Sequence, residues 1–233
     1  MKKFAKFIST LLLVVVAFYL GTVSSDKRLL SENLIRLHVV ADSNSAEDQA
    51  IKLQVRDAIT AKLETVMEDF PDLETAKAYL QAHLPELEKI ANDTLAAAGN
   101  SCQAVVTLAK EAFPTREYDT FTLPAGIYES LRVTIGSGEG KNWWCVVFPS
   151  LCASATTEGF EDTAVSAGFS DRVTGTLTGK REYRVRFFLL DCFGWVENWI
   201  YGKGFRKKPF FCRNVCDMIR KTQKEVTVCF GSY

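Results

Sequence analysis

Hydrophobic residues recur at every second position in several short stretches of the chain, and this period predicts half-buried β-strands. The clearest stretch is 34–41, where Ile35, Leu37 and Val39 lie on one side and Arg36 and His38 on the other. Four stretches share this strand character: 34–41, 102–108, 118–123 and 127–135. The chain therefore contains enough strands for a small sheet.

The stretch Trp143–Phe148 has hydrophobic residues on both sides of the predicted strand. Such a strand is usually covered on both faces, and the alternation alone does not identify what covers the second one. A glycine-rich connection, 136–140, separates it from the strand at 127–135. Because glycine takes the positive φ angles that tight turns need, we expect Pro124–Cys152 to form one β-hairpin.

Two longer stretches have the period of an amphipathic helix. The first runs from 46 to 67 and begins with Ser45 and Asp48, which have the spacing of a capping box. The second starts at Leu73 and contains Pro85, so we expect a kink or two abutting helices. The order β, α, α and then several β predicts an α+β two-layer sandwich, with an antiparallel or mixed sheet and helices packed on one face.

Residues 1–25 have the pattern of a targeting segment. Three lysines precede an uncharged apolar run, Phe7–Val23, and small residues follow it at Ser24 and Ser25. The run is short for a spanning helix and long for the core of a signal peptide, so a cleaved signal and an uncleaved anchor both fit. Either alternative predicts export of the rest of the chain across the cytoplasmic membrane.

The remaining chain divides into an α+β domain at 30–152, a linker at 153–180, an amphipathic helix at 181–200 and a tail at 201–233. The helix is too charged to span a bilayer, and it either lies on a membrane or a partner or packs back onto the sheet. Basic residues dominate the tail as far as Lys224, so membrane-surface contact through 181–224 and a solvated tail both remain open. The formal net charge is zero, which gives no global bias toward nucleic acid.

The chain has seven cysteines, and an exported chain can keep disulfides. Cys145 and Cys152 flank the bend at Pro149, which favours a disulfide between them over two buried thiols. The alternative is an exported thiol-dependent enzyme of the cell envelope with Cys145 as nucleophile and His38 or His83 as base. Its weakness is that no orienting acid stands at a recognisable spacing.

No cofactor or metal site is predicted. Cys212 and Cys216 would bring two sulfur atoms together on a helix, but a tetrahedral zinc site needs two more ligands. The glycines at 136, 138 and 140 superficially resemble a phosphate-binding loop, yet no helix follows to direct its N-terminal amides at an anion. Motifs alone therefore indicate an exported domain without a visible active site.

Over Leu34–Cys152 the chain resembles the stage II sporulation protein R family, the exported signalling proteins of endospore-forming bacteria. The matching motifs are LIRLHVVADS at 34–43, Val55-Arg56-Asp57, Phe113-Pro114-Thr115, LPAG at 123–126 with Tyr128, and a long run from Gly138 to Cys152 that includes NWWCV and FP. The tail beyond Ile200 matches nothing in the family, so the resemblance implies nothing about it.

The resemblance implies a signal rather than an enzyme. Family members are exported from the forespore into the space between the two sporulation membranes, where they activate a membrane-embedded aspartic-type protease that processes pro-sigma-E. The partner-binding candidates are Trp143 and Trp144 as anchors, because buried tryptophan dominates contact energy at interfaces, with Tyr128 and Arg132 on the neighbouring strand as secondary candidates.

Overall fold

The computed structural model describes residues 2–67, 70–118, 120–149, 165, 169–178 and 184–202. Helices in this part of the chain are α1 (Lys2–Asn33), α2 (Ala46–Met67), α3 (Leu73–Ala97), α5 (Asp171–Leu177) and α6 (Arg184–Gly202). Strands there are β1 (Ile35–Val40), β2 (Ala104–Phe113), β3 (Arg116–Glu117), β4 (Thr122–Leu123), β5 (Gly126–Ile135) and β6 (Asn142–Phe148).

The predicted strand at 34–41 and the helix at 46–67 are confirmed. The second helix, α3, continues through Pro85, so the alternative of two separate helices is wrong. The strand predicted at 118–123 is wrong for its first half, because the backbone N–H of Tyr118 donates to Phe121 O (2.8 Å) and only β4 is extended.

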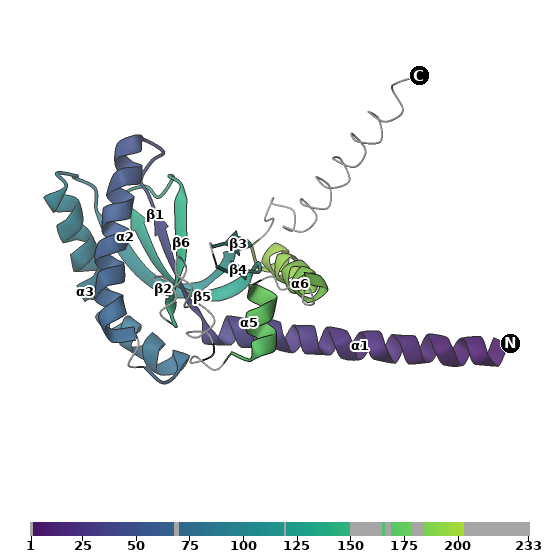
Figure 1. The fold of residues 1–233 in the computed structure, drawn as a ribbon. Helices are drawn as coiled ribbons and strands as arrows, with labels where there is room; N and C mark the ends of the chain where they lie inside the picture. The colour runs from purple at the N-terminus through teal and green to yellow at the C-terminus, as the bar shows by residue number, and fades with distance from the viewer. Residues whose placement is uncertain are drawn as a thin grey trace, which may run out of the picture.

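Four strands form one mixed sheet in the order β2-β5-β1-β6 (Figure 1). β1 pairs in parallel with β5 and antiparallel with β6, and β2 pairs antiparallel with β5. The α+β class with a mixed sheet is therefore confirmed. A separate pair of short antiparallel strands, β3 and β4, lies beside this sheet.

The expected hairpin is wrong, because β1 lies between β5 and β6. The glycine-rich connection passes over the end of β1 and hydrogen-bonds to it: Glu139 N–H donates to Asp42 O (3.1 Å) and Gly140 N–H to Ala41 O (2.9 Å). A Cβ on Gly140 would lie 2.3 Å from Ser43 O. Gly136 and Gly138 do take positive φ angles (55° and 65°), in a turn that Gly138 N–H closes on Ile135 O (3.1 Å), but the strands on either side of it are not paired. Gly140 serves the close approach to the end of β1.

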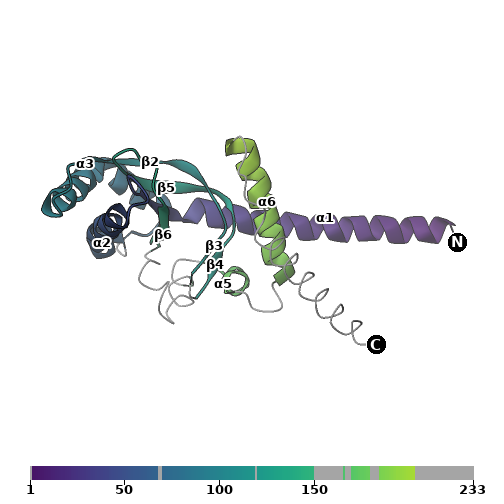
Figure 2. The ribbon, with the colours of Figure 1, turned by 90° about the horizontal axis from the view of Figure 1, so that it is seen from above.

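Helices α2 and α3 cover one face of the sheet, as predicted (Figures 1 and 2). Ser45 Oγ accepts from Asp48 N–H (3.0 Å) at the start of α2, and Asp72 Oδ1 accepts from Thr75 N–H (2.8 Å) at the start of α3. The fully buried residues between these helices and the sheet include Leu37, Val39, Val55, Ile59, Leu80, Leu131 and Val133.

The opposite face of the sheet is covered by segments from both ends of the chain. Its hydrophobic cluster joins Tyr128 and Val146 of the sheet to Val23 and Leu30 of α1, Val173 of α5 and Leu190 of α6. The second face of β6 is therefore closed by the chain itself at Val146, which is fully buried. Phe148, at the end of β6, is also buried but belongs to the cluster under α2 and α3, because the register shifts between Ile35 and Arg36.

Helix α1 has two parts with different surroundings. Its N-terminal part projects away from the sheet (Figure 1), and the large hydrophobic residues from Phe4 to Phe18 are exposed. Its C-terminal part packs on the domain, where Val23, Asp26 and Leu30 are buried. The segment Lys6–Asn33 is long and apolar enough to cross a membrane, which fits a signal sequence or an anchor.

Helix α6 packs back onto the sheet rather than standing apart from it. Asn198 Nδ2 donates to Phe113 O (2.7 Å), and Asp191 Oδ1 accepts from Ala125 N–H (3.0 Å). A Cβ on Gly194 would lie 1.5 Å from Ala125 O, so only glycine allows this approach. Helix α5 lies within the predicted linker 153–180 and packs in the second hydrophobic cluster. Of the other linker residues, only 165, 169, 170 and 178 are described, and the tail 203–233 lies outside the described residues.

Candidate partner-binding surface

Polar side chains form a row across the second face of the sheet, beside the cluster that α1, α5 and α6 cover. In the strand register His38 of β1 lies opposite Arg132 of β5 and Trp144 of β6. Two residues earlier in β1, Arg36 lies opposite Ser130. Because side chains two apart share a face, these residues from three strands project to one side.

Glu111 of β2 connects this row. Its carboxylate accepts from Ser130 Oγ (2.7 Å) and Arg132 Nη1 (2.8 Å), and it lies 3.0 Å from His38 Nδ1. Burial alone raises the pKa of Glu111, but the hydrogen bonds from His38, Ser130 and Arg132 outweigh it and lower the pKa to about 2. An ionised Glu111 only accepts, so the proton of the shared hydrogen bond lies on His38 Nδ1.

Arg36 is fully buried beside the same row. Its Nη2 donates to Tyr118 Oη (3.2 Å), and its Cζ lies 4.1 Å from the ring centroid of Phe113 and 5.0 Å from that of Tyr128. Its Nε and Nη1 have no hydrogen-bond partner, and none of the ion pairs among the described residues includes Arg36. Aromatic faces rather than a carboxylate therefore hold this cation.

Trp144 is fixed from both sides. Its ring stacks on His38, with centroids 5.5 Å apart, and Arg116 Cζ lies 3.5 Å from the Trp144 ring centroid. Burial lowers the pKa of Arg116, and the nearby charge of Arg36 lowers it further. We call Arg116, Arg132 and Trp144 the polar–aromatic surface, because all three side chains are partly exposed.

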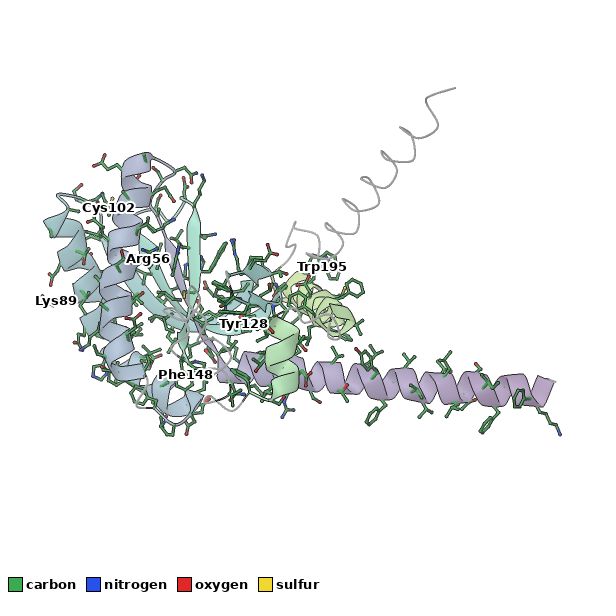
Figure 3. The ribbon with its side chains drawn as sticks, viewed as in Figure 1. Arg56, Lys89, Cys102, Tyr128, Phe148 and Trp195 are labelled. Atoms are coloured by element: carbon green, nitrogen blue, oxygen red, sulfur yellow. The ribbon has the colours of Figure 1, made fainter. Side chains whose placement is uncertain are left out.

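The predicted partner-binding residues do not all lie on this surface. Trp143 lies on the opposite face, where its ring centroid is 4.8 Å from Cζ of Arg56. Arg56 lies in α2 (Figure 3). Tyr128 is buried in the second cluster and its hydroxyl donates to Pro124 O (2.9 Å). The structure thus brings together Trp144 and Arg132, leaves Trp143 on the other face and places Tyr128 in the core.

Cys145 is disulfide-bonded and faces α2 and α3. Cys152 lies outside the described residues, so the pairing of these two cysteines stays a prediction. His38 points to the opposite face of the sheet from Cys145, and the His83 ring on α3 stacks on Tyr79, with centroids 3.9 Å apart. The predicted nucleophile is therefore bonded as a disulfide rather than present as a thiol, and His38 is not placed to act as its base.

Sequence reasoning missed Arg36, Glu111 and Arg116 as members of this site. Arg36 stands at a polar position of an otherwise apolar strand, which was a usable signal. Glu111 had no such signal, because its contacts depend on the strand register. Within the part of the chain that the structure describes, no group of three or more His, Cys, Asp or Glu side chains is placed to hold a metal ion.

The structure defines a class of protein: an α+β domain behind an apolar N-terminal helix, with a polar–aromatic surface on its sheet. The model of the stage II sporulation protein R family matches residues 31–158. Stage II sporulation protein R of Bacillus subtilis (strain 168) is 32% identical over 188 residues, which are 73% of this chain and 83% of the relative. No solved structure matches the chain at a significant level.

The chain therefore belongs to the stage II sporulation protein R family, as its motifs indicated, and the family supports a role in sporulation. The matched region contains β1, β2, β3, β5 and β6 and so the whole polar–aromatic surface. Helix α6 lies beyond it.

Proposed function

We propose that this protein is an exported sporulation signal that activates a membrane-embedded aspartic-type protease, which then processes pro-sigma-E into the active mother-cell sigma factor. The observation that carries the proposal is the family match over residues 31–158, because this region holds the complete sheet and its polar–aromatic surface. The site of action is the space between the forespore and mother-cell membranes. An apolar N-terminal helix that fits a signal or an anchor supports this location.

The polar–aromatic surface is the proposed contact with the protease. Tryptophan and arginine are the residues that most often dominate binding energy at interfaces. Trp144 is held between His38 and Arg116, so little side-chain entropy is lost when a partner covers it. The two arginines of the surface, Arg116 and Arg132, outnumber Glu111, and the fully buried Arg36 adds positive charge beside them, which suits a partner segment with carboxylate side chains.

Activation by binding alone requires a difference in affinity. The domain shifts the protease to its active state only if it binds that state more tightly than the inactive one. A pre-organised surface supports such selectivity, because a fixed Trp144 and its arginines cannot adapt equally well to two arrangements of the partner. We propose that the domain acts as a ligand that binds the active state more tightly, and not as a catalyst. The disulfide at Cys145 supports the absence of catalysis, because a disulfide-bonded sulfur is not a free nucleophile.

The test is co-expression of the full chain with the protease and pro-sigma-E, with cleavage of pro-sigma-E as the readout. Trp144→Ala should reduce the cleavage rate at least about tenfold, because loss of an interface anchor costs about 2 kcal/mol or more. Circular dichroism and resistance to trypsin establish that the variant is folded.

Trp143→Ala is the matched control, since it removes the same side chain from the adjacent position on the opposite face. It should leave cleavage within about twofold once the amounts of folded protein are equal. If Trp144→Ala fails to fold, Arg132→Gln takes its place, because the Arg132 side chain is 37% exposed. Full cleavage with a folded Trp144→Ala chain contradicts the proposed contact, and absence of cleavage with the unaltered chain contradicts the proposed function itself.

A further inference from the structure

We propose that α6 lies in the lipid–water interface of the membrane that α1 crosses, with its outward side in contact with lipid. The proposal rests on α1 as a retained anchor and is independent of the identity of the protease.

The outward side of α6 is apolar and exposed. The exposed fraction is 58% for Trp199 and 71% for Ile200, and three further residues of the same helix are exposed: Phe193, Val196 and Tyr201. Soluble proteins rarely leave so many large apolar side chains together in water.

Charge is almost absent from this side of the helix. Between Phe187 and Tyr201 the acidic and basic residues are Asp191 and Glu197. Asp191 is fully buried against the sheet, and Glu197 forms an ion pair with Lys27 of α1. Helix α6 itself therefore brings no unpaired charge to this side, although the Glu197 side chain is 45% exposed and the adjoining groove also contains Arg28, Glu32 and Lys110.

The ion pair also fixes the position of α6 along α1. Lys27 stands four residues after Val23, the last residue of the uncharged apolar run, which is about 6 Å at 1.5 Å per residue. Leu190 of α6 shares a buried cluster with Val23 and Leu30. Helix α6 thus crosses α1 within about one turn of the point where its apolar run ends.

Helix α6 leaves Trp199 turned away from the sheet domain, whereas Phe193, Val196 and Ile200 line a groove beside the C-terminal end of α1. Leu190, Gly194 and Asn198 face the sheet domain. The exposed N-terminal part of α1 extends on the other side of α6, away from the sheet, and α6 runs across α1 rather than along it (Figures 1 and 2). A helix that crosses a membrane-spanning helix at its end lies along the membrane surface.

The composition fits an interfacial helix. Trp199 combines an apolar ring with a polar N–H group, which favours the boundary between acyl chains and headgroups, whereas the Tyr201 hydroxyl donates to Lys110 O of β2 (3.2 Å). The sequence that follows is basic, with Lys203, Arg206, Lys207 and Lys208. Each basic residue near an anionic surface adds attraction, so the proposed partner is an anionic lipid bilayer.

Part of the outward side of α6 could be covered by a peptide instead of lipid, because it borders a groove. Phe193, Val196 and Ile200 also line a cavity of about 540 Å³ between α1, α6 and the strands β2 and β5. A peptide in this groove would shield those residues from solvent. Trp199 is not part of the groove lining, so contact between Trp199 and lipid separates the two occupants.

The experiment places the full chain in vesicles of phosphatidylcholine and phosphatidylglycerol whose acyl chains carry bromine near the headgroup. Bromine quenches tryptophan fluorescence on contact, and an interfacial helix buries its apolar side to this depth. We expect brominated lipid to quench the unaltered chain and Trp143→Phe alike, and to quench Trp199→Phe clearly less. Replacement of phosphatidylglycerol by phosphatidylcholine should weaken the quenching.

A second pair of variants tests the same contact by charge. Ile200→Glu should reduce the quenching of Trp199, whereas Val105→Glu, at a 53% exposed apolar position on β2, should leave it unchanged. Equal quenching of Trp199→Phe and the unaltered chain, with both recovered in the vesicle fraction, overturns the proposal. The result of the pro-sigma-E cleavage assay does not depend on the quenching of Trp199, so failure of the proposed function and failure of the proposed lipid contact can be distinguished.

Discussion

The two faces of the central sheet are built in different ways. The face under α2 and α3 is mainly apolar, with one ion pair between Lys77 of α3 and the buried Glu129 of β5, and it is completed by helices that follow β1 directly in the chain. The opposite face carries Arg36, His38 and Glu111 beside its apolar cluster, and it is completed by α1, α5 and α6 from the two ends of the chain. One face is a core with neighbours close in sequence, and the other combines polar side chains with distant segments.

This difference separates stability from recognition. Apolar burial on the α2–α3 face supplies non-directional free energy, whereas the buried cation and the Glu111 hydrogen bonds on the second face require fixed geometry. Buried polar groups that do not maximise stability are retained in some proteins for specificity. In this chain they support Trp144 from below, which fits a surface shaped for a partner.

The largest effect on stability should come from the α2–α3 face. Leu131 is fully buried in its cluster, so Leu131→Ala leaves a cavity and should lower the free energy of unfolding by about 3 kcal/mol. Urea denaturation followed by circular dichroism measures it. The proposed contact of α6 with lipid should persist in this variant, since α6 packs on the other face of the sheet. If the free energy of unfolding falls by less than about 1 kcal/mol, the α2–α3 face is not the main core.

The second effect concerns the Glu111 carboxylate and pH. Its folded-state pKa is lowered from 4.5 to about 2, so its stabilisation is complete above the unfolded pKa and is lost as the pH falls from about 4.5 to about 2. With its side chain 20% exposed, the contribution is about 2 kcal/mol after allowance for solvent screening.

Glu111→Gln should therefore lower stability by about this amount at pH 7 and flatten the stability curve between pH 5 and about pH 2. Glu32→Gln is the matched control, because Glu32 forms an exposed ion pair with Arg28 and its loss should cost less than about 1 kcal/mol. An unchanged acid profile in Glu111→Gln would show that other carboxylates govern acid unfolding.

Much of the α2–α3 face could be predicted from the sequence. The alternation around Leu37 and the helical period from Ala46 to Met67 are local signals, and each identifies its own buried side. Helix α2 also begins at the predicted cap, Ser45, whereas the Asp72 cap of α3 was found only in the structure. Local period and local caps were sufficient here because the packed elements follow each other in the chain.

The second face could not be predicted in the same way. The glycines at 136–140 suggested a hairpin, but strand order is decided by long-range pairing, and β1, buried at every position except His38, lies between β5 and β6. The contacts of Glu111 with His38 and Arg132 follow only from that order. Trp144 was identified from its unusual strand, whereas the side on which it lies required the register.

The smallest expected change in folding stability concerns Arg36, and it distinguishes most directly between the roles of the two faces. Its charge is fully buried without a carboxylate partner among the described residues, so its desolvation is repaid mainly by the rings of Phe113 and Tyr128. Methionine has a similar length and packs well against aromatic rings. Arg36→Met should therefore change the free energy of unfolding by less than about 1 kcal/mol, in either direction.

Arg36→Lys is the matched control, because lysine keeps the charge but its ammonium is more strongly hydrated and does not stack. Its stability should fall below that of both the unaltered chain and Arg36→Met in parallel urea titrations. If Arg36→Met is instead the least stable of the three chains, the guanidinium itself stabilises the sheet, and the polar interactions of the second face contribute to folding stability. If the predicted order holds, Arg36 is retained for the surface above it, and Arg36→Met should slow pro-sigma-E cleavage while the chain stays folded.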